Sequence, residues 1–137
     1  MKKLEILFLL TIFLLACKKD KQDKMLNEPF DTSQATLVSK ANFSSNAHPT
    51  SGCVNLYQKS GSYFLEFEGF KTDKGPDLRV YLSKAANNTN FIELGTLKAN
   101  NGNFYYSLPN TILLPDYKYV LIWCEDFSVL FGNALLN

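Results

Sequence analysis

Four side chains of this 137-residue sequence have the chemistry for catalysis, ligand binding or covalent modification: Cys17, Cys53, Cys124 and His48, the single histidine. One imidazole excludes sites that need two in one chain, such as blue-copper centres and HExxH zinc proteases. The sequence has no CxxC or CxxCH pattern, which excludes a thioredoxin-type redox pair and covalently attached c-type haem. The use of an odd number of thiols is therefore the first question.

Cys17 follows a targeting segment. Met1-Lys2-Lys3 is a short cationic start, and the apolar run Ile6–Leu15 is too short to cross a bilayer but has the length of a signal-peptide core. Leu14-Leu15-Ala16-Cys17 resembles the bacterial lipobox, which implies cleavage before the cysteine and its acylation. We expect residues 1–16 to be a lipoprotein signal peptide, and residues 17–34 to be a lipidated cysteine with a polar tether.

Charge differs between this tether and the rest of the chain. The 14 basic and 13 acidic side chains give a formal net charge of +1, which provides no electrostatic footprint for nucleic acid. Lys18–Lys24 contains four Lys and two Asp, whereas residues 25–137 carry eight basic and ten acidic groups. We expect the basic segment to be a solvated spacer, with contact to anionic headgroups as the alternative.

The expected location is the cell envelope, with the membrane as a partner through the lipid anchor. Lys18 rather than Asp follows the lipidated Cys17. By resemblance to lipoprotein sorting rules, this favours the outer membrane over the inner one. Whether the domain faces the periplasm or the cell surface stays open.

Residues 35–137 have the pattern of an all-β domain. Short runs rich in Val, Ile, Phe, Tyr and Leu are separated by Gly, Asn, Pro and Asp, and no run has a 3.6-residue period. Tyr63–Glu68 and Leu78–Leu82 alternate with a period of two, which is typical of half-buried strands. We predict an antiparallel β-sandwich or flattened barrel of about eight to nine short strands. The predicted strands cover residues 36–43, 53–57, 63–68, 78–82, 91–97, 104–108, 117–124 and 127–135.

The segment Asn100-Asn101-Gly102-Asn103 contains an Asn-Gly pair, which tolerates the positive φ angles of a type I′ turn. We therefore predict a hairpin that joins the strand over residues 91–97 to the strand over residues 104–108. Pro109 and Pro115 bracket a loop or a single helical turn.

Several motifs stand between or at the ends of these strands. They are Ala47–Gly52 (AHPTSG), Gly75–Leu82 (GPDLRVYL), Leu94–Lys98 (LGTLK), Tyr106–Pro109 (YSLP), Val120–Cys124 (VLIWC), Phe127–Val129 (FSV) and Phe131–Ala134 (FGNA). In this order, over about residues 36–136, they resemble the DM-thirteen domain, the Skeletor-type "electron transfer" module. The resemblance implies an all-β fold, an extracytoplasmic location and a characteristic cysteine in the Trp-Cys motif. An envelope redox or protein partner is compatible with it, but the sequence does not identify one.

A redox role has been proposed for the cysteine of the Trp-Cys motif in that family, as a bare thiol or as a ligand to a prosthetic group. By position, this cysteine is Cys124. The sequence itself gives no indication of haem or of another cofactor, and it contains no metal-ligand pattern. Cys53 departs from the family, because the residue after the Ser-Gly pair is usually not a cysteine there.

Three uses of Cys53 and Cys124 are open. Outside the cytoplasm they could form a disulfide, which would close a loop of about seventy residues and add roughly 4 kcal/mol of stability. Both could instead be inert thiols, because a buried cysteine behaves as a small hydrophobic side chain. The third use is redox chemistry at an exposed, electropositive Cys124, with Cys53 as the resolving partner.

The remaining candidate residues each have a structural and a functional interpretation. His48 is either an exposed loop residue before Pro49, or the base of a thiol, or an axial haem ligand. No GxSxG motif accompanies it, so we expect a module without substrate turnover of its own. Gly75-Pro76-Asp77 is most simply a tight turn that begins a strand. Trp123, which alternates with Leu121, is most simply a packing residue.

Two functions of different classes follow. The first is a lipid-anchored redox or electron-transfer module that acts through Cys124. The second is a lipid-anchored binding or scaffold domain in which Cys53 and Cys124 are structural. The first requires a thiol or disulfide that solvent can reach, whereas the second requires an inert bridge or a buried thiol.

Overall fold

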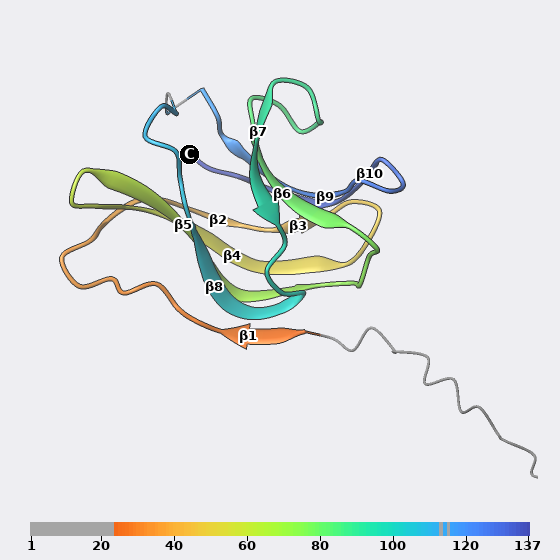
Figure 1. Cartoon of the computed structure of the whole chain (residues 1–137), viewed down its shortest axis with the longest axis horizontal. Coiled ribbons are helices and arrows are strands. Elements are labelled where there is room, and N and C mark those ends of the chain that lie inside the picture. Colours follow the sequence, from red (N-terminus) through yellow and green to blue (C-terminus); the bar gives the residue numbers. More distant parts are fainter. Residues whose placement is uncertain (1–23, 113, 115) are drawn as a thin grey trace, which may run out of the picture.

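The computed structural model describes residues 24–112, 114 and 116–137, so the predicted signal peptide and Cys17 lie outside the described residues. The described chain forms two β-sheets that pack around a common apolar core (Figure 1). This confirms the predicted all-β sandwich. In this part of the chain, no helix has the length and apolar character needed to cross a membrane.

Each sheet contains five strands. The first has the order β1-β8-β5-β4-β2, and the second has the order β3-β10-β9-β6-β7. Neighbouring strands are antiparallel, except that β1 pairs with β8 in parallel. The strands are β1 (Met25–Asn27), β2 (Thr36–Asn42), β3 (Ser44–Ser45), β4 (Thr50–Lys59), β5 (Ser62–Thr72), β6 (Leu78–Ser83), β7 (Phe91–Thr96), β8 (Asn101–Ser107), β9 (Tyr119–Cys124) and β10 (Val129–Leu135).

The period-two pattern assigns side chains to the faces of the sheets as predicted. Leu65 and Phe67 of β5, and Val80 and Leu82 of β6, are completely buried between the sheets. The ring of Phe67 lies 5.0 to 5.6 Å from the rings of four other core aromatics. Bulky aromatic rings therefore fill the space that two short sheets enclose.

The predicted hairpin at Asn100–Asn103 is wrong. The strand before it, β7, belongs to the second sheet, whereas β8 belongs to the first, so the chain crosses between the sheets. Asn101–Asn103 form the beginning of β8, where they pair with β1. Gly102 does have a positive φ of +124°, but the reason is a close approach: a Cβ there would lie 1.9 Å from the carbonyl oxygen of Leu26.

The segment between β1 and β2 packs on the outer face of the first sheet. The Phe30 ring lies 5.4, 4.7 and 5.3 Å from the rings of Tyr57, Phe64 and Tyr105. The Phe30 amide donates a 3.2 Å hydrogen bond to the buried carboxylate of Glu66. These contacts attach the N-terminal part of the described chain to the domain.

We predict that Gly102→Ala weakens the attachment of β1. The added methyl group would collide with the Leu26 carbonyl, so the free energy of unfolding should fall by about 1–3 kcal/mol more than in Gly61→Ala. Gly61 is a matched control because it also has a positive φ, +78°, but has open space around its Cβ position. Urea denaturation measures both variants, and equal losses in the two would contradict the prediction.

Candidate functional site

Motif residues that are far apart in the sequence meet at one end of the sandwich, on the right in Figure 1. The amides of Asn46 and His48 donate hydrogen bonds of 2.8 and 3.2 Å to the carbonyl oxygen of Phe131 in β10. The amide of Glu125, after β9, donates to the carbonyl oxygen of Asp77 at 3.0 Å. We call this surface the motif end; it comprises the β3–β4 connection (46–49), the β5–β6 connection (73–77) and the β9–β10 turn (125–128).

The His48 side chain has two partners at the motif end. Its ring stacks on the Phe131 ring, with 3.9 Å between centroids and 26° between planes. Its Nδ1 lies 2.9 Å from Oδ2 of Asp73, and both side chains are partly exposed. His48 is therefore a loop residue that an aromatic ring and a carboxylate orient, and the contact it makes is with a carboxylate rather than with a thiol.

Gly75 and Asp77 shape the β5–β6 connection. A Cβ on Gly75 would lie 2.7 Å from Cδ2 of Leu78 and 3.1 Å from Cζ of Phe131, so glycine allows this connection to pack closely on both side chains. Asp77 accepts two hydrogen bonds, of 2.6 and 3.1 Å, from the Arg79 guanidinium. These bonds hold the pKa of Asp77 below its ordinary value. Gly75-Pro76-Asp77 thus has the contacts of a strand-initiating turn.

Trp123 and Cys124 face opposite sides of the second sheet. Trp123 is buried on the outer side, where its ring lies 6.3 Å from that of Tyr81. Cys124 faces the core, is 0% exposed, and is paired with Leu78 of β6 and Val129 of β10. Leu78 in turn lines a shallow hollow of about 200 Å³ at the surface. Cys124, the redox candidate, is thus a core residue whose neighbour on β6, Leu78, lines a surface hollow.

Cys53 lies on the other side of the molecule. Its neighbours Val54 and Leu56 point into the core, so Cys53 points away from it, on the outer face of the first sheet. Its Sγ donates a 3.0 Å hydrogen bond to Oδ1 of Asn42. Both thiols are free, and the first sheet lies between the two sulfur atoms. The Cys53–Cys124 bridge is not formed in this arrangement.

The residues around His48 do not fit a haem group. Phe131 covers one face of the imidazole. The contact of Asp73 with Nδ1 leaves Nε2 as the ligating atom, so the lining of the surrounding space decides whether a cofactor fits. A hollow of about 390 Å³ beside Asp73 is lined by Lys, Thr, Asp and Asn side chains rather than by the apolar groups that usually bury a cofactor. Among the described residues, no cluster of three or more His, Cys, Asp or Glu side chains is placed to hold a metal ion.

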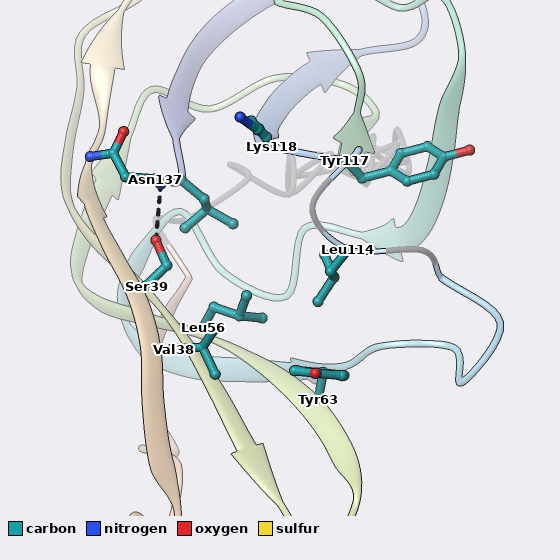
Figure 2. A pocket seen from close by; sticks show the side chains of 9 residues that line it. Val38, Ser39, Leu56, Tyr63, Leu114, Tyr117, Lys118 and Asn137 are labelled. Carbon is teal, nitrogen blue, oxygen red and sulfur yellow. Dashed lines mark hydrogen bonds between the residues drawn. The ribbon is translucent and has the colours of Figure 1, made fainter.

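A third hollow, of about 260 Å³, lies at the opposite end of the sandwich, where β5 and β9 begin and β10 ends (Figure 2). Its walls include the core residues Leu56 and Leu136 and the ring of Tyr63. Beside it, the amide of Asn137 donates a 3.0 Å hydrogen bond to Oγ of Ser39. Nothing in the sequence pattern predicted this hollow, because its walls come from separate strand ends.

Sequence reasoning also missed two residues of the motif end, Asp73 and Phe131, as partners of His48. Asp73 is separated from His48 by 25 positions and Phe131 by 83, so spacing alone could not pair them. A signal existed for Asp73: it directly follows a strand and precedes the Gly-Pro turn, where an exposed carboxylate is free to meet a neighbouring connection.

We predict that the Asp77–Arg79 pair makes stability depend on acid pH. A carboxyl group with a lowered pKa in the folded state stabilises the fold above its unfolded-state pKa of about 3.9, and this contribution is lost as pH falls toward the folded-state value. Asp77→Asn should therefore be less stable than wild type at pH 6, with a difference that shrinks below about pH 4. Urea denaturation across this range measures it. Arg79→Gln should lose the same pH-dependent part, together with the contact of Arg79 with Glu93. A difference that stays constant from pH 6 to pH 2 would contradict the prediction.

Comparison with known proteins identifies the family to which this chain belongs. No curated protein and no solved structure is significantly similar to the chain. The family model for the electron transfer DM13 domain matches residues 42–136, more than half of the chain. The matched region contains every segment of the motif end, whereas β1 precedes it. The chain belongs to the electron transfer DM13 family, which suggests a redox-related module.

Proposed function

We propose that this protein is a lipid-anchored binding module of the cell envelope that serves electron transfer through its motif end, with Cys53 and Cys124 as structural thiols. The observation that carries the proposal is the complete burial of Cys124, the cysteine to which the family resemblance assigns the redox role. Under this proposal, the redox group belongs to a partner, and the domain supplies the surface that the partner binds.

Thiol–disulfide exchange makes demands that Cys124 does not meet. A thiolate must reach a disulfide sulfur and attack it directly. Cys124 has Leu78 and Val129 on the two neighbouring strands and no exposed surface. Cys53 is not placed to resolve a mixed disulfide, because it lies on the outer side of the first sheet.

The motif end has the properties of a contact surface. Three connections are fixed there by backbone hydrogen bonds to Phe131 and Asp77, so their shape is set before a partner arrives. The partly exposed imidazole of His48 and carboxylate of Asp73 offer polar groups with a fixed direction. A pre-organised surface loses little conformational entropy when it binds.

The second candidate is redox chemistry at Cys124 itself, and one observation favours it. Leu78, which lines the surface hollow of about 200 Å³, is the β6 neighbour of Cys124. Movement of this side chain would bring the thiol toward solvent. The exposed thiolate would then attack a disulfide of an envelope partner, form a mixed disulfide and release the partner's other sulfur as a thiolate.

The lipid anchor is part of the proposal. Leu14-Leu15-Ala16-Cys17 supports cleavage before Cys17 and acylation of that residue, and Lys18 supports delivery to the outer membrane. Of the tether predicted over residues 17–34, β1 and Phe30 pack on the first sheet. Residues 18–23 then join the lipid to Lys24, the first residue of the described domain.

Thiol labelling of the folded, full-length protein separates the two candidates. We expect an alkylating reagent to modify Cys53 in the native state, and to modify Cys124 at least about tenfold more slowly, through global unfolding. Peptide mass spectrometry with and without denaturant measures both sites, and Cys53→Ser provides the background for Cys124 alone. If native Cys124 were labelled as fast as Cys53, the binding-module proposal would be contradicted and redox chemistry at Cys124 would be supported.

Acylation is tested at Cys17. We expect wild type to lose residues 1–16 and to carry acyl chains on the new N-terminus, whereas Cys17→Ser should retain residues 1–16 and carry none. The mass of the N-terminal peptide measures both properties. Cys53→Ser is the matched control, since it removes another thiol but should leave processing intact. A Cys17→Ser protein that is still cleaved after Ala16 would indicate an ordinary signal peptide.

A further inference from the structure

The two most exposed large apolar side chains of the described domain are Met25, at 73%, and Phe127, at 70%. Met25 begins β1, and Phe127 lies in the turn between β9 and β10. The sequence separates them by 102 positions. A single exposed apolar residue is ordinary on a protein surface. The positions of Met25 and Phe127 relative to each other therefore decide whether they indicate a binding surface.

Both residues lie at the same end of the sandwich, Phe127 within the motif end and Met25 beside it. Met25 pairs with Asn101 of β8, which pairs with Lys71 near the end of β5. The β9–β10 turn is attached to the β5–β6 connection through the hydrogen bond from Glu125 to Asp77. Lys24 and Asp77 line the same hollow of about 200 Å³. Lys24, which precedes β1, lines this hollow, and the turn that carries Phe127 is attached to one of its walls at Asp77. In Figure 1 the start of β1 and this turn both lie on the right.

The point at which the tether leaves the domain is also fixed there. The backbone amide of Lys24 donates a 2.8 Å hydrogen bond to Oδ1 of Asn100. Seven residue steps separate Lys24 from Cys17. Even a fully extended chain of this length spans at most about 25 Å. If Cys17 carries the lipid, this end of the sandwich stays within that distance of the bilayer surface.

Charge neither drives nor forbids contact between this end and a membrane. Four lysines lie at or beside it, and four carboxylates balance them, one of which is paired with Arg79. The charged groups that face this surface are Lys24, Lys71, Lys74, Lys98, Asp73, Asp77, Glu125 and Asp126. With a near-zero balance, attraction to anionic headgroups is weak, and exposed apolar groups and the tether must supply the contact.

We propose that the motif end rests on the headgroup region of the bilayer that holds the lipid anchor, with the side chains of Met25 and Phe127 inserted into the interface. The inference rests on the proposed acylation of Cys17. Aromatic side chains prefer this depth of a membrane. A short tether keeps the motif end near the bilayer at an effective concentration in the millimolar range. Insertion of two apolar side chains is then enough to hold the motif end on the membrane, whereas a domain without the tether would not bind.

This orientation turns the long axis of β6 away from the membrane. β6 begins with Leu78 at the motif end, and its last residue, Ser83, pairs with Phe91 at the other end of the strand. At about 3.3 Å per residue, Phe91 lies roughly 17 Å farther from the bilayer than Leu78. Phe91 is 39% exposed and therefore offers a matched reference position.

The test uses the full-length acylated protein in phosphatidylcholine vesicles that contain brominated acyl chains, which quench tryptophan fluorescence at short range. Phe127→Trp and Phe91→Trp are compared, each corrected for Trp123, which both retain. We expect quenching of the Phe127→Trp signal to be at least about threefold stronger. Adding phosphatidylglycerol should change neither value appreciably, because the charges at this end balance.

The outcomes separate the orientation from the anchor. Mass spectrometry and co-sedimentation first establish that the protein is acylated and vesicle-bound; a protein without acyl chains that stays in solution would overturn both proposals. An acylated, bound protein with equal quenching at the two positions, or with stronger quenching at residue 91, would overturn the orientation alone. Loss of the difference in Phe127→Trp when Met25 is changed to Ser would support the contribution of both side chains.

Discussion

The motif end depends on Phe131. Its carbonyl oxygen accepts hydrogen bonds from the amides of Asn46 and His48, so the β3–β4 connection is attached to β10. Its ring supports the imidazole of His48 and, together with Leu78, crowds the position of a Cβ on Gly75. The next residue, Gly132, makes space for Thr50, whose side chain would lie 2.4 Å from a Cβ there. One aromatic residue and two glycines thus bring three connections within contact of one another.

The packing of Leu78 beside Gly75 also explains why Cys124 can be a core residue in this member of an electron transfer family. Leu78, packed beside Gly75, covers the end of β6, and Cys124 is its neighbour on β9. A sulfur atom fits this apolar site as a small, polarizable side chain. Replacing it with a bulkier residue would press on Leu78 and Val129, so the position is constrained by volume whether or not the thiol reacts.

Sequence patterns predicted the faces of the strands better than their connections. Alternation placed Leu65, Val80 and Ile122 in the core and Trp123 on the opposite face, because one side of each sheet must be buried. It failed at Asn101–Asn103, where the Asn-Gly pair marks a close approach to β1 and the chain changes sheets. The very short β1 and β3 carry no apolar run long enough to reveal them.

Sequence motifs predicted only part of the candidate site. Gly75, Asp77, Trp123 and Cys124 could be selected by motif, but the pairing of His48 with Asp73 and Phe131 arises from tertiary packing. The proposed role of Cys124 rests on its burial, and burial at a strand end depends on what the neighbouring connections cover. A periodic pattern contains no information about those connections.

The hydrogen bonds between its connections make the motif end a rigid, prebuilt surface and not a set of open loops. Amide hydrogen exchange of the native protein, followed residue by residue by NMR, tests it most directly. The account predicts that the amides of Asn46, His48 and Glu125, which hold the three connections together, exchange as slowly as amides in the central strand β9. Exchange of these three amides at the rate of an unprotected chain, while β9 stays protected, would contradict it.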